Sequence, residues 1–294
     1  MTEHFGTTTG DTRPAAQTSY NDGLMDKACE AFLSANEARE KLTIARALVD
    51  LIPSHASVAD LGGGNAVVAK NVLSLAQKEG KTLRHLTFVE PTDLLIRQAQ
   101  QRLSDYENVT FVHDCFAIGI DTISDVSMDV IYESNALPNF GDNLSLVVSQ
   151  IAQKLAKGGK FISILPRHDK GGYGTLNRWG FEKICETNSW YDTTNDYASL
   201  AQDATEQFAS THPGYTAEVS DLDSTFFYPM IDGDINKTIQ YLLVFMFDLS
   251  WEDDKFNQLL QQTHEYLSEN NMISAEGISM SLVFQVLTLQ KNTN

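Results

Sequence analysis

The sequence reads Val58-Ala59-Asp60-Leu61-Gly62-Gly63-Gly64-Asn65-Ala66 at the point that decides the fold. Residues 57–61 have the apolar character of a buried strand, and Val68, Val72 and Leu75 recur beyond the glycines at helical spacing. Glycines at such a turn let a ligand approach the backbone closely, and the start of the helix offers unpaired N–H groups. The stretch therefore predicts a ligand-binding loop between a strand and its helix.

The spacing of the small residues separates two classes of ligand. A dinucleotide fingerprint, G-x-G-x-x-G/A, needs a small residue at position 67, where this chain has the bulky Val67. The pattern acid-x-G-x-G-x-G/A is met by Asp60, Gly62, Gly64 and Ala66. Because a carboxylate attracts an ammonium group and repels a pyrophosphate, Asp60 favours a cationic ligand over a dinucleotide.

Strand and helix patterns alternate around this loop. Two helical stretches, near residues 24–33 and 44–52, precede it, and a helix after residue 144 is expected to end in a cationic turn with Lys154, Lys157 and Gly158. The later strand patterns lie at 85–90, 109–113, 129–133 and 160–165. This alternation predicts an α/β fold, a doubly wound, mainly parallel seven-stranded sheet with helices on both faces.

The regular alternation stops after Pro166. Later strand patterns are expected at 224–230 and 279–290, and helices at 235–249 and 254–267. The expected segments are a flexible tail (1–20), a helical lid (21–54), a ligand-binding core (55–166), a substrate cap (167–223) and C-terminal strands and helices that complete the sheet (224–294).

Composition limits the partners. The chain has 294 residues with 39 acidic and 21 basic side chains, a formal charge of −18, so a phosphate backbone or an anionic lipid surface would be repelled. Cys29, Cys115 and Cys185 form no CxxC pair, which argues against a disulfide framework or a zinc site. No apolar run approaches the roughly 20 residues that span a bilayer. We expect a cytoplasmic protein with no nucleic-acid or membrane partner, as a monomer or homodimer.

Acidic residues follow the next two strands. Glu90 ends the second strand, where a carboxylate can accept both hydroxyls of a ribose. His113-Asp114-Cys115-Phe116 follows the third strand; there Asp114 can accept an exocyclic amine, and Cys115 or Phe116 can flank a purine ring.

These segments resemble the successive cofactor motifs of the class I, Rossmann-like S-adenosylmethionine-dependent methyltransferase superfamily, small-molecule type, over residues 55–166. The resemblance implies S-adenosyl-L-methionine as cofactor and S-adenosyl-L-homocysteine as product. It assigns cofactor binding to Asp60, Gly62, Gly63, Gly64, Glu90, Asp114, Cys115, Phe116 and Glu133. The family's fourth motif corresponds to residues 129–138, where Tyr132-Glu133-Ser134-Asn135 is an uncommon version and Ala66 is a minor departure in the first motif.

Methyl transfer from a sulfonium asks mainly for alignment and exclusion of water. A carboxylate acceptor needs no base, whereas a phenol, an alcohol or a protonated amine must lose a proton first. The candidate catalytic residues are His168, Glu133 and Tyr132. Clustered oxygen ligands are not evident, so we expect no metal.

Acceptor binding is expected near the strand ends and in the aromatic-rich cap. The candidates are Tyr20, Asn135, Arg167, Tyr173, Trp179 and Tyr228. The layout after Tyr228-Pro229-Met230 is similar to that of small-molecule carboxylate methyltransferases, such as those acting on trans-aconitate or juvenile hormone acid. O-methylation of a small organic acceptor is thus favoured, with a carboxylate as one target. The alternatives are N-methylation of an amine or heterocycle, a nucleotide-linked oxidoreductase and a non-enzymatic cofactor-binding protein.

Overall fold

The computed structural model describes residues 39–137, 140, 144–185, 197–247 and 256–293. The chain divides into two compact units. Among the described residues, the larger unit comprises those within 39–227 and 279–293, and the smaller unit those within 228–278. The loop of glycines lies in the larger unit.

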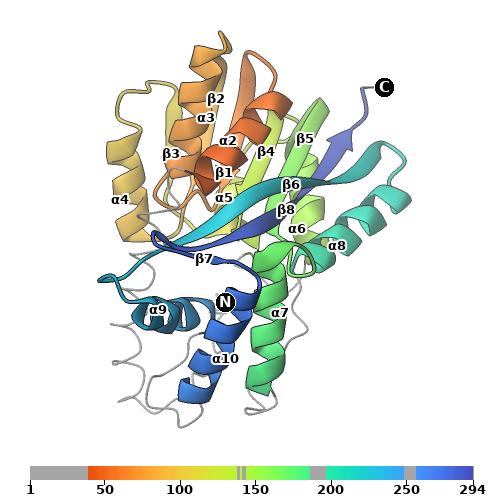
Figure 1. Ribbon diagram of the computed structural model, residues 1–294. Helices are drawn as coiled ribbons and strands as arrows, with labels where there is room; N and C mark the ends of the chain where they lie inside the picture. The colour runs from red at the N-terminus through yellow and green to blue at the C-terminus, as the bar shows by residue number, and fades with distance from the viewer. Residues whose placement is uncertain (1–38, 138–139, 141–143, 186–196, 248–255, 294) are drawn as a thin grey trace, which may run out of the picture. The chain divides into compact units, whose positions relative to one another are not determined.

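A single sheet organises the larger unit, with the strand order β3-β2-β1-β4-β5-β8-β6 (Figure 1). Neighbours from β3 to β5 are parallel, and β8 is antiparallel to β5. The strands are β1 (Ala56–Leu61), β2 (Leu83–Val89), β3 (Val109–Val112), β4 (Met128–Ser134), β5 (Leu155–Pro166), β6 (Tyr215–Pro229) and β8 (Gly277–Lys291). This path confirms the predicted mainly parallel sheet of seven strands; the two-residue β7 (Ile273–Ser274) pairs with β8 as an eighth.

The strand order places the candidate site. From β1 the chain proceeds through β2 to β3 on one side and then returns to β4 on the other side of β1. At such a reversal, the connections after the two central strands lead to opposite faces of the sheet, and a crevice opens at their carboxyl ends. The glycine loop follows β1 directly, so the fold positions it at this crevice.

Helices cover both faces of the sheet, as right-handed crossovers require. The helices of the larger unit are α2 (Glu40–Leu51), α3 (Val67–Lys78), α4 (Asp93–Arg102), α5 (Phe116–Asp121), α6 (Leu144–Lys154), α7 (Gly171–Cys185) and α8 (Tyr197–Thr211). α2 packs against α3, and α6 packs against α8 (Figure 1). Of the predicted lid, only residues from 39 onward are described, and they contribute α2.

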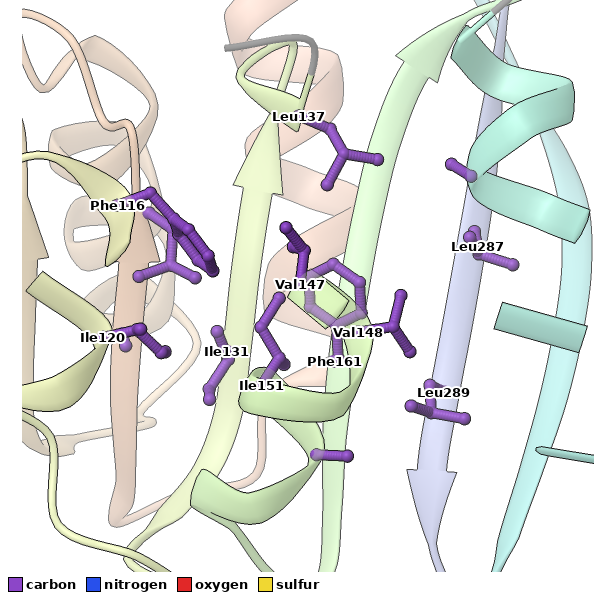
Figure 2. Close-up of a cluster of buried hydrophobic side chains, with 14 of the residues drawn as sticks. Phe116, Ile120, Ile131, Leu137, Val147, Val148, Ile151, Phe161, Leu287 and Leu289 are labelled. Atoms are coloured by element: carbon purple, nitrogen blue, oxygen red, sulfur yellow. The ribbon is translucent and has the colours of Figure 1, made fainter. Parts of the chain in front are cut away.

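An apolar core joins the sheet to α5, α6 and α8. Figure 2 shows Ile131 and Phe161 of neighbouring parallel strands directed toward Val147 and Ile151 of α6. Leu287 extends the same core onto β8. Side chains alternate between the faces of a strand, so these odd-numbered positions of β4, β5 and β8 form one continuous apolar surface.

Two predicted boundaries were wrong. The helix α6 ends at Lys154 and β5 begins at Leu155, so Lys157 and Gly158 belong to the strand and not to a helix cap. Gly158 has a φ of +76°, and the register shifts between Met128 and Val130. The glycines therefore accommodate an irregularity that keeps this part of the chain in the sheet. Strand β6 also begins earlier than predicted, at Tyr215.

Helix α5 was not predicted. It has six residues and contains Gly119, so it has no apolar stripe of useful length. A Cβ at Gly119 would lie 2.4 Å from Cγ1 of Val89. The glycine thus allows the helix to approach β2 closely, a packing requirement that composition alone does not reveal.

The described part of the smaller unit contains two helices, α9 (Ile235–Phe247) and α10 (Phe256–Glu269), close to the predicted ranges. They pack against each other, and Tyr228, which is buried, lies with its ring centroid 6.1 Å from that of Phe245. Within the described residues of either unit, no helix combines the length and hydrophobicity needed to cross a membrane.

Candidate functional site

A cavity of about 400 Å³ lies at the carboxyl ends of β1, β2 and β4. Its walls come from the glycine loop, the turn after β2, the start of α5 and the segment after β4. The residues that line it are Gly62, Gly64, Val89, Glu90, Pro91, Thr92, Leu95, Cys115, Phe116, Asn135, Ala136 and Phe140. The fold therefore brings together residues from four separate connections at the crevice that the strand order creates.

The three glycines of the loop have different roles. A Cβ at Gly62 would lie 2.5 Å from the Cβ of Ala136, and one at Gly63 would lie 2.2 Å from the ring of Phe88. Glycine at these positions is required for packing. Gly64 has a φ of +59°, and a Cβ there would meet nothing within 4 Å. Since Gly64 lines the cavity, its missing side chain leaves space for a ligand.

Glu90 ties the glycine loop to the next connection. One carboxylate oxygen accepts a hydrogen bond from the Gly64 N–H at 2.9 Å, and the other accepts one from the Thr92 N–H at 2.9 Å. Only 5% of Glu90 is exposed. The side chain thus fixes the shape of the cavity mouth while placing a carboxylate in its wall.

Asp60 lies beneath the loop and not in the cavity wall. It is 1% exposed, and the Tyr132 hydroxyl donates a hydrogen bond to its Oδ2 at 2.9 Å. That oxygen is 2.9 Å from where a Cβ of Gly63 would stand. Burial raises the pKa of Asp60 to about 7; the charges of Glu133 and Glu90 add to the rise, and the hydrogen bond from Tyr132 opposes it.

Tyr132 and Glu133 are both fully buried and are not among the residues that line the cavity. In the sheet, Tyr132 pairs with Asp60, and Glu133 pairs with Ser163. Since consecutive residues of a strand point to opposite faces, the two predicted catalytic side chains diverge. Burial and the charge of Asp60 raise the pKa of Tyr132 well above its usual value.

Glu133 accepts hydrogen bonds from the turn after β4 and from β5. The N–H groups of Ala136 and Leu137 donate to Oε2 at 2.8 and 3.0 Å, and the Ser163 hydroxyl donates to Oε1. Burial raises the pKa of Glu133 to about 7, although these hydrogen bonds lower it. The carboxylate holds the turn after β4, from which Ala136 and Phe140 reach the cavity.

At a pH near 4.5, where the buried carboxyl is not forced to ionise, replacement of Glu133 by Ala is expected to reduce the free energy of unfolding by about 3 kcal/mol, because two buried N–H groups and one hydroxyl lose their acceptor. Urea denaturation measures the loss. Ser163→Ala removes only one donor and should cost roughly 1 kcal/mol. Equal losses in both variants would show that the carboxylate does not organise this turn.

The carboxyl groups of Asp60 and Glu90 set the electrostatic character of the cavity. Asp60 lies under the loop, Glu90 lies in the wall, and no Lys or Arg is among the residues that line the described cavity. A buried carboxylate with a raised pKa is stabilised in its charged form by an incoming cation. The site therefore suits a ligand with a positive charge, and it would repel a pyrophosphate.

The segment after β3 forms an apolar wall. Asp114 Oδ1 accepts a hydrogen bond from the Cys115 N–H at 2.9 Å, and Cys115 presents an exposed thiol to the cavity. The rings of Phe116 and Phe140 stack with centroids 4.4 Å apart and an interplanar angle of 12°. Such a stacked pair offers a flat apolar surface to an aromatic ring of a ligand.

Asn135 reaches the cavity through an uncommon backbone conformation. Its φ is +58°, and its N–H donates to the Ile164 carbonyl at 3.1 Å. Asparagine tolerates this left-handed region better than most residues. This conformation ends β4 and turns the chain at the cavity. Asn135 therefore lies at the end of the strand, where the sequence predicted it.

Arg167 and His168 lie at the end of β5 but do not line the described cavity. Arg167 donates two hydrogen bonds of 2.7 Å to Asp169 and one of 3.2 Å to Asp221. The hydrogen bonds and charge of Asp169 raise the pKa of Arg167. His168 Nδ1 lies 2.9 Å from Nδ2 of Asn177. Arg167 is thus engaged in a local ion-pair network.

The aromatic acceptor-binding candidates are also outside this cavity wall. Tyr173 packs against Phe226 with ring centroids 4.8 Å apart, and desolvation, with the charge of Glu40, raises its pKa to about 12. Trp179 is half-buried in α7, and Tyr228 belongs to the smaller unit. The candidate Tyr20 lies outside the described residues.

Six lining residues were not predicted from the sequence. Pro91 and Thr92 follow Glu90 directly, so the strand-end signal at Glu90 could have included them. Phe140 carried no local signal, since only the turn after β4 brings it to Phe116. The others are Val89, Leu95 and Ala136.

Among the described residues, no group of three or more His, Cys, Asp or Glu side chains is arranged to hold a metal ion. The acids around the glycine loop are engaged with N–H and O–H donors, as described above. Nothing in this part of the chain assigns a metal to the cavity.

Comparison with known proteins concerns the fold. No family model and no curated protein matches the chain. A candidate type II methyltransferase from Anaeromyxobacter dehalogenans aligns with a TM-score of 0.54 and 14% identity, over 85% of this chain and 95% of the other. A candidate methyltransferase from Bacillus halodurans C-125 aligns with a TM-score of 0.52 and 13% identity, over 86% and 99%. The chain therefore has the Rossmann-like fold of the class I methyltransferases.

Proposed function

We propose that this protein is an S-adenosyl-L-methionine-dependent methyltransferase, of the EC 2.1.1 class, that acts on a small organic acceptor. The observation that carries the proposal is the cavity beside the glycine loop, with the carboxylate of Asp60 beneath the loop and that of Glu90 in the wall. The likeness in fold to two candidate methyltransferases agrees with it.

The charge distribution favours this cofactor over a dinucleotide. S-adenosylmethionine carries a sulfonium and an ammonium group, whereas NAD carries an anionic pyrophosphate. A dinucleotide fold binds that pyrophosphate at the glycine loop and the start of the following helix. Here Asp60 and Glu90 bracket the loop, and their negative charges would oppose an anion at this point.

The residues fit the parts of the cofactor. Gly64 leaves open space for the methionine end, and Asp60 would stabilise its positive charge from below. Glu90 lies in the wall where hydroxyls of a ribose can donate to it, while the stacked rings of Phe116 and Phe140 suit an adenine. When bound, the cofactor supplies a methyl group from its sulfonium, and S-adenosylhomocysteine is the product.

The acceptor is proposed to be methylated on oxygen, with a carboxylate as one target and N-methylation of an amine or heterocycle as the alternative. A carboxylate needs no general base. The ionisable side chains that line the described cavity are Glu90 and Cys115, and Glu90 already holds two backbone N–H groups. An acceptor that is already ionised near neutral pH needs no proton removed, so it does not depend on a general base in this lining.

The proposed partners follow from the charge. With a formal charge of −18, the chain is expected to act on small molecules rather than on nucleic acid or at an anionic membrane surface. We propose a cytoplasmic monomer or homodimer. The segments 21–54 and 167–223 are proposed as lid and cap over the acceptor, with the cap ending before residues 215–223, which belong to strand β6.

Calorimetric titration with S-adenosylmethionine, S-adenosylhomocysteine and NAD(H) tests the cofactor. Micromolar binding of the first two without binding of NAD(H) is expected because the acids at the loop attract the cationic group and repel the pyrophosphate. Binding of NAD(H) alone would overturn the proposal. If S-adenosylmethionine binds as expected, screening of acids and amines with the methyl-labelled cofactor separates O- from N-methylation.

The thiol of Cys115 reports on the location of binding. Cys115 is exposed and lines the cavity, so saturating S-adenosylhomocysteine should slow its alkylation by iodoacetamide several-fold. Mass spectrometry of the Cys115 peptide measures the rate, and NAD(H) serves as the control ligand. An unchanged rate in the presence of bound S-adenosylhomocysteine would exclude this cavity as its site.

A further inference from the structure

A second cavity, of about 480 Å³, lies between α3 and α4. Asn65 contributes from the end of the glycine loop, Lys70 from α3, and Gln98, Gln101 and Arg102 from α4. No residue is common to the two cavities. It is therefore a separate feature, although Asn65 directly follows Gly64 of the first cavity.

Every side chain that lines this second cavity carries N–H donors. Lys70 and Arg102 are cationic, and Asn65, Gln98 and Gln101 have carboxamide groups that donate through nitrogen. No carboxylate and no apolar side chain is present in the lining. A hollow with this composition is suited to an oxyanion, because its lining offers several N–H donors and two positive charges.

Helices α3 and α4 are basic in a strongly negative chain. Helices α3 and α4 carry four basic side chains and one acidic side chain, Asp93, and Asp93 forms an ion pair with Arg97. The whole chain has a formal charge of −18. Two of these four basic side chains, Lys70 and Arg102, line the cavity.

We propose that this cavity is a binding site for the phosphate group of a small molecule. A phosphate group has three or more acceptor oxygens and up to two negative charges. It therefore matches the two cations and three carboxamides of the lining better than a ligand with a single carboxylate would. A long polyanion is disfavoured because the rest of the chain would repel it. The proposal does not depend on the methyltransferase activity.

The geometry gives the two cations different parts. Lys70 is exposed, so its ammonium can move to meet a ligand at the mouth. Arg102 is half-buried at the end of α4. Its guanidinium has five N–H donors, and a single one directed to a phosphate oxygen makes a charge-assisted hydrogen bond. Free phosphate and a phosphorylated metabolite share this chemistry, so both are used as probes.

Isothermal titration of the full chain with sodium phosphate, pyrophosphate and glycerol 3-phosphate, at constant ionic strength, tests the site. Saturable binding of at least one probe is expected. Lys70→Gln and Arg102→Gln should each weaken it roughly tenfold or more, since each removes a charge-assisted hydrogen bond. Lys78→Gln on α3 and Arg97→Gln on α4 make the same charge changes outside the lining and should alter the affinity less than about twofold.

The outcomes are distinct. Tighter binding of glycerol 3-phosphate than of inorganic phosphate, lost in the two lining variants, would assign the site to phosphorylated metabolites; the reverse order would assign it to free phosphate. Equal weakening in all four variants would indicate a response to net charge and overturn the proposal, as would no saturable heat at millimolar probe. Lys70 is exposed, so Lys70→Gln retains a folded test protein if Arg102→Gln does not fold.

Discussion

Replacement of Asp60 by Asn is expected to weaken the binding of S-adenosylmethionine by about a hundredfold while making the ligand-free protein more stable above pH 7. The affinity falls because a buried negative charge beneath the glycine loop is lost where the cationic part of the cofactor is proposed to bind. The hydrogen bond from the Tyr132 hydroxyl can be retained by the amide oxygen. Calorimetry measures the affinity and urea denaturation the stability.

The stability change has a definite sign. Because the folded-state pKa of Asp60 is raised from 3.8 to about 7, the folded protein binds this proton more tightly than the unfolded chain does. Stability contributed by the protonated group is present below pH 3.8 and is lost as the pH rises toward 7. At about 1.4 kcal/mol per pKa unit, the cost at pH 8 is up to about 4 kcal/mol. Asp60→Asn removes it, so its advantage should be larger at pH 8 than at pH 5.

The same protonation should govern cofactor affinity. Below pH 7 the uncharged Asp60 no longer attracts a cation, so the dissociation constant of S-adenosylmethionine should increase as the pH falls from 8 to 6. Tyr132→Phe is a sharp control: it removes the hydrogen bond that lowers the pKa of Asp60, and the midpoint should move to higher pH. An affinity that is constant between pH 6 and pH 8 in the wild-type protein would contradict this role.

Replacement of Gly64 by Val is expected to abolish cofactor binding and leave the sheet folded. A Cβ at this position meets no protein atom within 4 Å, so the branched side chain enters the cavity instead of the core. The backbone φ of +59° adds a conformational cost of about 1–2 kcal/mol. Titration with S-adenosylhomocysteine measures binding, and circular dichroism with urea denaturation measures folding.

Gly80 provides the matched control for that cost. Its φ is +72°, a Cβ there would also meet nothing within 4 Å, and it lies beyond α3 outside the cavity lining. Gly80→Val should lose a similar amount of stability and keep normal affinity. If the two variants bind S-adenosylhomocysteine equally well, the cofactor does not approach the loop at Gly64.

Short-range sequence signals were sufficient for the central strands. The run from Ala56 to Leu61 is buried at every position, and a continuous apolar run of this length is typical of a parallel strand covered on both faces. The glycines after it could be recognised as a turn, and the structure gives each one a reason: close packing at Gly62 and Gly63, and a positive φ at Gly62 and Gly64. The position of the cavity at the reversal of strand order then follows from connectivity.

Elements whose form depends on distant partners were harder to predict. Tyr215–Pro229 is a 15-residue strand whose first part, 215–223, was predicted to belong to the cap. About half of the residues in that part are exposed and polar, so only pairing within the sheet identifies it as a strand. Likewise, Gly158 resembles a helix cap in sequence, whereas the pairing of β5 with β4 places it inside a strand.

By itself, the sequence determined the α/β fold, the glycine loop and the identity of the acids that follow it, because strand burial, turn conformation and residue spacing are encoded locally. Tertiary structure decided what those acids do. Asp60 meets Tyr132 across 72 residues, and Glu133 meets Ser163 across 30. It also paired Phe116 with Phe140, and it engaged Arg167 with Asp169 and Asp221. Burial and hydrogen bonding between distant segments set these roles, and no local pattern records them.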